Sequence, residues 1–350
     1  MQTRVPRQIL VTGGAGFIGA NFVHHLLRCN NETHVLIVDA LTYAGSLANL
    51  EGLDAGRYTF IQEDIRDHAA MTSIFSRYEP DTVVNFAAES HVDRSIDGPL
   101  GFVETNVLGT AVLLEAARMG WKDRDGTRFH HVSTDEVYGS LGPEGRFSET
   151  SPIRPSSPYS ASKAGADHLV NAYRHTYGMD VTISNCSNNY GPRQFPEKLI
   201  PLILSNALAD KPLPVYGKGE NIRDWLHVDD HAAAILAIIT RGEPGRTYNV
   251  GGDEEWTNID LVRALCRRLD EIRPRADGRY EELISFVPDR PGHDARYAVD
   301  SSRIRSELGW APARSFEEGL DQTIRWYLDN GPWLDRIRTE KYGGERLGLS

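Results

Sequence analysis

The feature that most constrains the fold is a glycine-rich loop directly after the first apolar run of the chain. Residues 8–12 are largely β-branched and apolar, and residues 12–19 read T-G-G-A-G-F-I-G. Gly13 permits a tight turn, Gly16 lets backbone N–H groups approach a pyrophosphate, and Gly19 allows a helix to pack closely on the preceding strand. Such a loop is typical of a dinucleotide-binding fold, although a plain turn between a strand and a helix uses the same glycines.

Acidic residues and a small-residue loop follow the next predicted strands. Asp39 lies about 20 residues beyond the last glycine, where a carboxylate bonds a ribose 2′-hydroxyl and repels a 2′-phosphate. The pattern therefore favours NAD over NADP. Asp64, which precedes Ile65, either accepts a hydrogen bond from an adenine amine or caps the helix that begins at His68. The loop 86–90 either lets the backbone pass close to the cofactor or is an ordinary connection.

Short β-branched runs alternate with longer amphipathic segments through the first half of the chain. We predict strands over residues 8–12, 33–39, 58–62, 82–86, 128–133 and 180–184. We predict helices over residues 17–29, 68–77, 101–119 and 160–177. This alternation is typical of the α/β class, in a doubly wound, Rossmann-type parallel sheet of about six strands.

The pattern changes after residue 190, where prolines separate shorter elements and the alternation of strand and helix is lost. We therefore predict a dinucleotide-binding domain over residues 1–190 and a smaller, interleaved C-terminal substrate domain over residues 191–350. A predicted helix over 229–241 and a strand over 248–250 return residues 229–252 to the first domain. We expect the ligand cleft between the domains, outside the carboxyl ends of the strands.

The composition limits the classes of partner and the cellular compartment that we expect for the chain. A formal net charge of -11 argues against a nucleic-acid partner, because phosphate backbones are bound by clustered Lys and Arg. Cys29, Cys186 and Cys266 form no C-x-x-C pair, so we expect no disulfide framework, no metal site and a cytoplasmic setting. Residues 1–7 lack a signal peptide's apolar core and are expected to fray. The longest apolar run, 232–239, is too short for a membrane span and predicts a buried helix.

A tyrosine and a lysine share one face at the start of a predicted helix. Tyr159 and Lys163 follow Pro158 and are four residues apart. An ammonium beside a phenol favours the phenolate and lowers a pKa that is otherwise about 10. Tyr159 is therefore a candidate base for a sugar hydroxyl, although exposed helical Tyr–Lys pairs have the same spacing.

Two adjacent carboxylates come directly after the fifth predicted strand, at the end of the sheet where ligands bind. They are Asp135 and Glu136. If one is desolvated and the other stays ionised, a single loop can donate one proton and accept another near neutral pH. The alternative is that they cap a helix or face water.

The motifs together resemble the extended short-chain dehydrogenase/reductase superfamily, through T-G-G-A-G-F-I-G at 12–19 and Y-S-A-S-K at 159–163. Narrower motifs resemble the dTDP-glucose 4,6-dehydratase family. They are A-A-E-S-H-V-D-R-S-I at 87–96, S-T-D-E-V-Y-G at 133–139, S-N-N-Y-G-P at 187–192, P-E-K-L-I-P at 196–201, R-D-W-L-H-V-D-D-H at 223–231 and D-R-P-G-H at 289–293. The resemblance extends from the first strand to about residue 330.

The resemblance implies a catalytic role for each of five residues. Tyr159 takes the proton from the sugar 4-hydroxyl while hydride passes from carbon 4 to NAD, and Lys163 and Thr134 assist. Glu136 removes the proton at carbon 5, and Asp135 protonates the departing 6-hydroxyl. Hydride then returns to carbon 6, which leaves a 4-keto-6-deoxy sugar.

The resemblance also implies the binding residues. Cofactor contacts are expected at Gly13, Gly16, Phe17, Ile18, Gly19, Asp39, Thr42, Asp64, Ile65, Phe86, Ala87, Ala88, Ser90, Thr105, Tyr159, Lys163 and Asn189. Substrate contacts are expected at Ser90, Thr134, Asn188, Lys198, Leu199, Pro214, Tyr216, Arg223, Asn258, Arg290 and His293. Arg223 and Lys198 suit a pyrophosphate in an otherwise acidic protein, although a surface ion pair is the alternative for each.

The resemblance leaves three other functions to be distinguished. One is a GDP-mannose or CDP-glucose 4,6-dehydratase, and another is a nucleotide-sugar epimerase or decarboxylase. A third, a non-catalytic NAD(H)-binding sensor, would lack Tyr159, Lys163 or the acid pair, and this chain has them all. The family resemblance further implies a homodimer paired through the helices over 101–119 and 160–177.

Overall fold

The computed structural model describes residues 4–289 and 293–341. Its centre is a seven-stranded sheet in the order β10-β6-β5-β4-β1-β2-β3, in which every pair of neighbouring strands is parallel. The strands are β1 (Gln8–Thr12), β2 (His34–Val38), β3 (Tyr58–Ile61), β4 (Thr82–Asn85), β5 (Arg128–Thr134), β6 (Val181–Cys186) and β10 (Thr247–Val250). The order reverses at β1 and β4, which is where a doubly wound sheet opens a ligand crevice.

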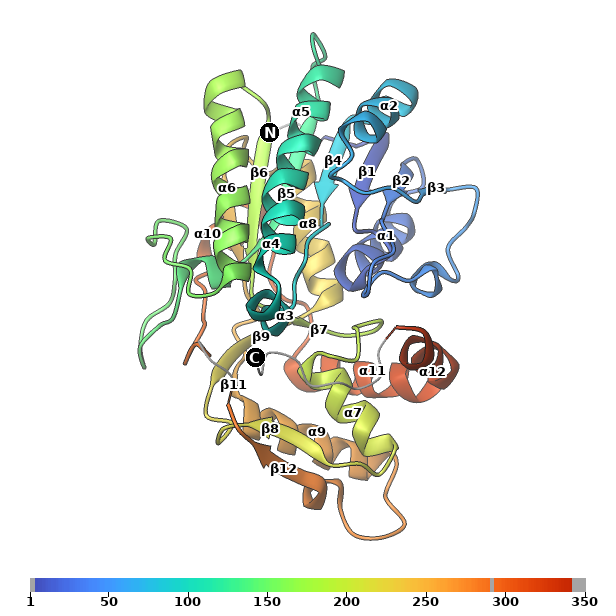
Figure 1. Cartoon of the computed structure of the whole chain (residues 1–350), viewed down its shortest axis with the longest axis vertical. Helices are drawn as coiled ribbons and strands as arrows, with labels where there is room; N and C mark the ends of the chain where they lie inside the picture. The colour runs from blue at the N-terminus through green and yellow to red at the C-terminus, as the bar shows by residue number, and fades with distance from the viewer. Residues whose placement is uncertain (1–3, 290–292, 342–350) are drawn as a thin grey trace.

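Helices cover both faces of this sheet (Figure 1). On one face lie α1 (Phe17–Cys29) and α8 (Val228–Arg241), and on the other lie α2 (His68–Tyr78), α5 (Thr110–Gly120) and α6 (Pro158–Tyr177). Side chains alternate along β1, since Ile9 and Val11 pack with α1 and α8 while Leu10 packs with α2 and α5. Both faces are therefore buried, as a parallel sheet requires.

The second half of the chain builds a separate core below the sheet in Figure 1. Its small sheets are β11-β9-β7 and β12-β8, made of β7 (Asn188–Tyr190), β8 (Leu213–Tyr216), β9 (Ile222–His227), β11 (Glu255–Thr257) and β12 (Ile284–Val287). Its helices are α7 (Leu199–Leu208), α9 (Asn258–Ile272), α11 (Phe316–Asp329) and α12 (Gly331–Glu340), and α10 (Ser302–Leu308) lies against β10. Short helical turns are η1 (Leu47–Leu50), α3 (Val92–Asp97), η3 (Asp135–Tyr138) and η4 (Tyr280–Leu283).

The predicted fold class is confirmed. Each of the six predicted strands is present with its ends shifted by at most two residues, and α1 has the predicted bounds. β10 pairs in parallel with β6 at the edge of the large sheet, so the chain returns to this sheet after leaving it. The buried helix predicted from the apolar run 232–239 lies within α8.

The helix predicted over 101–119 is not one regular α-helix. It consists of α4 (Pro99–Phe102), a π-helical segment η2 (Val103–Gly109) and α5. Within η2, Asn106 is buried, accepts a hydrogen bond from Glu89 N–H at 2.8 Å and donates to Glu89 C=O at 3.0 Å and Ser162 Oγ at 2.8 Å. These bonds fix the loop after β4 to α6. The whole run Pro99–Gly120 is long and apolar enough to cross a membrane by length and composition alone. Core helices of soluble proteins meet the same criterion, and half of the most apolar 18 residues of this run are buried within the protein.

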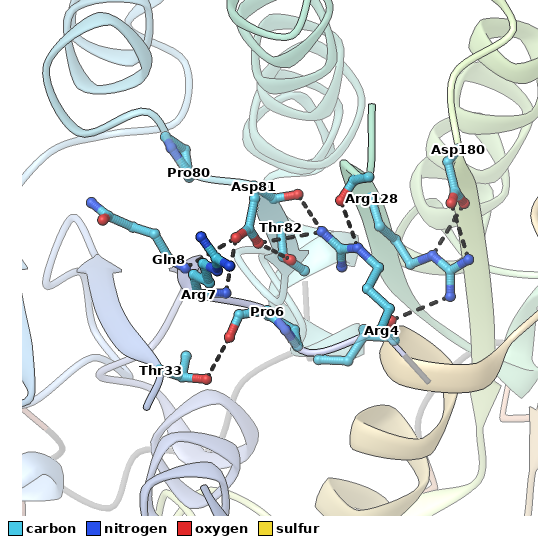
Figure 2. A network of polar contacts seen from close by, with 12 residues as sticks. Arg4, Pro6, Arg7, Gln8, Thr33, Pro80, Asp81, Thr82, Arg128 and Asp180 are labelled. Atoms are coloured by element: carbon cyan, nitrogen blue, oxygen red, sulfur yellow. Dashed lines mark hydrogen bonds and ion pairs between the residues drawn. The ribbon is translucent and has the colours of Figure 1, made fainter. Parts of the chain in front are cut away.

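The expectation that the N-terminal segment frays is wrong for residues 4–7 (Figure 2). Arg4 N–H donates to Thr240 C=O at 3.0 Å, and the Arg4 guanidinium donates to Gly126 C=O at 2.7 Å and Asp81 C=O at 2.6 Å. The Asp81 carboxylate accepts the Arg7 N–H at 2.8 Å. The segment is held because its polar groups find partners at the amino ends of the strands.

Candidate active site

The glycine loop between β1 and α1 has no room for side chains at two positions. Gly13 has a φ of +64°, and a Cβ atom there would lie 2.8 Å from Ala87 N. A Cβ atom on Gly19 would lie 2.3 Å from the Gly13 carbonyl oxygen. The start of α1 therefore lies against a bare backbone turn, and such a turn at a helix N-terminus suits a phosphate group.

Asp39 lies at the end of β2 and helps to hold this loop. Its carboxylate accepts the Ala15 N–H at 2.9 Å and the Leu41 N–H at 2.8 Å. Burial raises the pKa of Asp39, although the hydrogen bonds from these amides oppose the shift. The side chain therefore forms part of the loop's structure and also lines the cavity beside it.

The alternative that Asp64 caps the following helix is wrong. The cap of α2 is Asp67, whose carboxylate accepts the Ala70 N–H at 2.9 Å. Asp64 instead accepts hydrogen bonds from the backbone and guanidinium of Arg66, which hold the pKa of Asp64 below its usual value although partial burial opposes them. The sequence offers two aspartates three residues apart, and only the later one lies at the N-cap.

A cavity of about 400 Å³ runs along the carboxyl ends of the large sheet. All the residues expected to contact the cofactor line it, namely Gly13, Gly16, Phe17, Ile18, Gly19, Asp39, Thr42, Asp64, Ile65, Phe86, Ala87, Ala88, Ser90, Thr105, Tyr159, Lys163 and Asn189. Thr134, Asp135 and Glu136 line the same cavity. The structure thus brings the glycine loop and the proposed catalytic residues to one cavity.

The two adjacent carboxylates lie in different environments. Asp135 is 2% exposed, and its Oδ1 accepts a hydrogen bond from the Thr134 hydroxyl at 3.3 Å, whereas no donor in the described part of the chain reaches its Oδ2. Burial, reinforced by the charge of Glu136, raises the pKa of Asp135 well above its usual value. Glu136 is half-buried. Neither carboxylate is the N-cap of η3, because that cap is Thr134, whose hydroxyl accepts the Glu136 N–H at 3.3 Å.

The expected lowering of the Tyr159 pKa by Lys163 is not found. Burial raises the pKa of Tyr159 well above its usual value, and the charge of Glu136 adds to the shift while a hydrogen bond with Thr134 opposes it. The Lys163 ammonium lies against β5, where it donates to Val132 C=O at 2.8 Å. Desolvation of the phenol is therefore the largest influence on its pKa.

A second cavity, of about 650 Å³, lies over the smaller sheets. The expected substrate contacts that line it are Ser90, Asn188, Lys198, Leu199, Pro214, Tyr216, Arg223, Asn258 and His293. Thr134 lines only the first cavity, and Arg290 lies outside the described residues. The cavities meet, because Ser90, Glu136, Asn188, Glu197 and Lys198 line both.

The two expected cationic substrate contacts line the second cavity, and Arg223 is buried rather than at the surface. Arg223 is 6% exposed, and its guanidinium lies over the Tyr297 ring at 4.4 Å and donates to Asp294 C=O at 3.0 Å. Lys198 Nζ donates to Ser90 C=O at 3.1 Å, at the junction of the two cavities. Both cations line the second cavity, where their positive charge suits an anionic ligand.

Sequence reasoning missed several lining residues. Arg338 reaches the second cavity from α12, and Tyr297 reaches it from the segment before α10. Glu197 lies in the P-E-K-L-I-P motif and accepts a hydrogen bond from Arg94 Nε at 3.4 Å. Of these three, only Glu197 had a signal in the sequence, since it is next to Lys198 in that motif. Arg338 and Tyr297 come from distant segments that folding brings together.

The glycine loop, Tyr159, Lys163 and the acidic pair line one cavity, which meets a second cavity at Glu136. This arrangement is similar to that expected of the nucleotide-sugar enzymes among the extended short-chain dehydrogenase/reductases. A family model described as GDP-mannose 4,6 dehydratase matches residues 10–323. The dTDP-glucose 4,6-dehydratase of Escherichia coli is 54% identical, over 98% of this chain and 99% of that protein. The chain belongs to the dTDP-glucose 4,6-dehydratase family.

Solved structures agree with this assignment. The structure of DesIV, a dTDP-glucose 4,6-dehydratase from Streptomyces venezuelae crystallised with NAD, has a TM-score of 0.87 and 46% identity and covers 94% of this chain and 99% of its own. A UDP-glucose 4-epimerase from Thermotoga maritima has a TM-score of 0.82 at 29% identity, over 92% of this chain and 99% of its own. The fold is thus shared with epimerases, but the chain has a higher sequence identity to the dehydratase than to the epimerase.

Proposed function

We propose that the chain is an NAD-dependent dTDP-glucose 4,6-dehydratase, which converts dTDP-glucose to dTDP-4-keto-6-deoxyglucose with loss of water. The observation that carries this proposal is the unequal pair of carboxylates in the first cavity, of which Glu136 also lines the second. Asp135 is buried with a raised pKa, whereas Glu136 is half-buried and lines both cavities. Elimination beside a ketone needs one acid and one base, and this loop supplies both.

The first cavity fits a dinucleotide. The bare turn at Gly13 and Gly19 leaves space that a Cβ atom would fill, next to the N-terminus of α1. A pyrophosphate is expected there, and Asp39 is placed to accept a ribose hydroxyl. When bound, NAD supplies the acceptor that takes hydride from carbon 4 and returns it to carbon 6.

The protein's own groups move the protons. Tyr159 takes the proton of the 4-hydroxyl, with Thr134 and Lys163 assisting. This step needs the phenolate, which burial opposes and the hydrogen bond with Thr134 favours. The 4-ketone acidifies the proton at carbon 5, which Glu136 removes. Asp135 protonates the 6-hydroxyl as it leaves, and Glu136 returns its proton to carbon 5 when hydride reaches carbon 6. Burial raises the pKa of Asp135, which favours the protonated form that a general acid needs.

One turnover leaves the catalytic residues with protons to exchange, and Thr134 is placed to transfer one between them. After one turnover Tyr159 holds an additional proton, and Asp135 has lost one to the departing water. The Thr134 hydroxyl is hydrogen-bonded to Asp135 Oδ1 at 3.3 Å and is also a hydrogen-bond partner of Tyr159. A hydroxyl both donates and accepts, so Thr134 can pass the proton from the phenol to the carboxylate.

The second cavity is proposed to hold the nucleotide sugar. Arg223 and Lys198 supply positive charge for its pyrophosphate in a protein of net charge -11. The choice of dTDP-glucose over GDP-mannose rests on the near-full-length relatives at 54% to 56% identity, which are named for dTDP-glucose. Asn258 and His293 are the proposed contacts that complete this site, together with Arg290 outside the described residues.

The test is incubation of the purified protein with dTDP-glucose, GDP-mannose or CDP-glucose, followed by mass analysis. We expect loss of one water from dTDP-glucose alone, without added oxidant and without build-up of NADH, because hydride never leaves the enzyme. Preferential dehydration of another nucleotide sugar would correct the substrate. Stoichiometric NADH would show a simple dehydrogenase, and an unchanged mass with an inverted carbon 4 would show an epimerase.

The oligomeric state and setting belong to the same proposal. Exposed apolar side chains on the run 99–120 and on α6 favour a homodimer, and they are Leu100, Val103, Leu108, Met119 and Tyr177. Leu108→Asp should give monomers in sedimentation velocity, whereas Phe286→Asp on β12, equally exposed, should not.

Three free cysteines fit the proposed cytoplasmic setting. The domain boundaries at 190 and 191, with 229–252 returning, remain a prediction.

A further inference from the structure

A buried group of three titratable side chains lies where α6 packs on β5, and the proposed mechanism leaves two of them without a role. His131 is on β5, and Lys163 and Asp167 are on α6. Their exposed fractions are 0%, 3% and 6%. A lysine and an aspartate buried to this extent are rare unless they are paired.

The contacts in this group form a chain that ends at the lysine. Lys163 Nζ lies 3.3 Å from His131 Nε2, and the same ring nitrogen lies 3.5 Å from Asp167 Oδ1. Asp167 Oδ2 accepts a hydrogen bond from the Ser133 hydroxyl at 2.8 Å. The ammonium and the carboxylate thus face one imidazole nitrogen from two sides.

Hydrogen bonds on the far side of the ring determine where its proton lies. The Thr12 hydroxyl donates to Asn85 Oδ1 at 2.6 Å, which turns the Asn85 amide nitrogen toward His131 Nδ1 at 3.1 Å. Nδ1 therefore accepts, and the single proton of the neutral ring is on Nε2, where it faces Asp167, so Nε2 accepts no hydrogen bond from Lys163. Burial, reinforced by the Lys163 charge, lowers the pKa of His131 well below its usual value, so the ring stays neutral.

Asp167 supplies the largest negative influence on Lys163. Because burial raises the pKa of Asp167 to about 7, its charge is present above about that pH, the range in which Lys163 titrates. We infer that Asp167, acting across the neutral ring of His131, is the positioning residue that keeps the Lys163 ammonium charged and fixed, one helical turn from Tyr159 on α6. This inference rests on the proposed function for its effect on turnover, but the charge of Lys163 can be measured without substrate. Neither His131 nor Asp167 touches the reacting sugar in this assignment.

The direction of the effect follows from the groups around Lys163. These are Asp167 on its own helix, His131 on β5 and Cys186 on β6. Burial lowers the pKa of Lys163 to about 8, while Asp167 and then Cys186 raise it against that shift. Removing the carboxylate removes the larger of the two influences that raise the pKa of Lys163, so Lys163 should lose its proton at a lower pH.

The first measurement is an NMR titration of protein whose lysines carry carbon-13 at Cε. The chain has six lysines, so the signals are few, and a Lys163→Arg variant identifies the one of interest. Asp167→Asn should lower the Lys163 midpoint by about one pH unit or more, the usual effect of an opposite charge at this range. His131→Gln should shift it in the same direction, and it serves as the second variant if Asp167→Asn does not fold.

A neighbouring histidine provides the matched control. His130 is equally buried on β5, but its ring nitrogens contact Thr182 Oγ1 at 2.9 Å and Ser184 Oγ at 3.1 Å. His130→Gln should cost stability without moving the Lys163 midpoint. An unchanged midpoint in both Asp167→Asn and His131→Gln would overturn the inference.

The second measurement is the pH dependence of kcat with dTDP-glucose. The fall in kcat at alkaline pH should begin at lower pH in Asp167→Asn, by the same shift as the NMR midpoint, and not in His130→Gln. A shifted midpoint with an unshifted kcat profile would overturn the role in turnover. Failure of the wild-type protein to act on dTDP-glucose would count against the proposed function only, because the NMR titration is independent of it.

Discussion

At the scale of single residues, two adjacent carboxylates with the same chemistry lie in different environments. The sequence identified Asp135 and Glu136 as a pair, but it gave no sign of which one is buried. The structure shows that Asp135 points inward, with Oδ2 reached by no described donor, while Glu136 lines both cavities. Burial therefore assigns the acid and leaves the base to Glu136.

Substitutions at three residues should stop the reaction at three different steps. Glu136→Gln keeps the shape but removes the base, so oxidation at carbon 4 proceeds and reduced cofactor builds up on the enzyme. Asp135→Asn leaves exchange of the carbon 5 proton intact but slows water loss by about 10²–10⁴-fold, as for a lost general acid. Tyr159→Phe should suppress the first oxidation. Single-turnover absorbance and deuterium exchange distinguish these outcomes, and arrest of all three variants at one step would contradict separate roles.

Asp39 should select the cofactor. A 2′-phosphate would lie against a carboxylate that is 8% exposed, so the apoprotein should bind NAD much more tightly than NADP. Asp39→Asn keeps an acceptor for the Ala15 amide and should reduce the preference for NAD over NADP. Asp64→Asn is the control, and it should change both affinities alike because its carboxylate pairs with Arg66. Calorimetric titration that showed equal affinity for both dinucleotides in the wild type would refute this selection.

At the scale of elements, the glycine loop shows how closely β1 and α1 approach. Gly19→Ala would place a Cβ atom 2.3 Å from the Gly13 carbonyl oxygen, so the loop must move. We expect a loss of about 1–3 kcal/mol in the free energy of unfolding, typical of overpacking, and weaker binding of NAD. Gly142→Ala is the matched control, since nothing lies within 4 Å of its Cβ position. Urea unfolding and NAD titration of both variants provide the check, and equal behaviour would show that the close contact is tolerated.

The elements that the sequence predicted are those with a pattern long enough to recognise. Strands β1 to β6 are apolar runs between turns, and helices α1 and α6 carry their stop signals, such as Gly178 in the left-handed region after α6. The three-residue strands β7 and β11 are too short to show a period, and the π-helical η2 keeps a helical composition. The group of His131, Lys163 and Asp167 needs the packing of α6 on β5, which no local pattern contains.

At the scale of the whole molecule, the two ends of the large sheet have separate tasks. The carboxyl ends of its strands carry the joined cavities, and the amino ends carry the polar network around Asp81 (Figure 2). In that network Arg128 donates to Asp180 at 3.0 Å and to Ile238 C=O at 2.9 Å, which ties β5 to β6 and α8. Stability at one end and chemistry at the other should therefore respond to different substitutions.

Arg4 provides the test of this separation. Arg4→Ala removes donors from Gly126 C=O and from Asp81, and hydrogen bonds to a charged group contribute about 1.5–3 kcal/mol each. Because the Asp81 carboxylate keeps the Arg7 and Gln8 amides, we expect a net loss of about 1–3 kcal/mol in the free energy of unfolding, measured in urea. Arg7→Ala should change it by less than about 0.5 kcal/mol, because only the backbone of this exposed residue contributes. At a temperature well below unfolding, kcat should be the same in both variants and in the wild type. A fall in kcat for Arg4→Ala under those conditions would show that the amino ends of the strands are coupled to the active site.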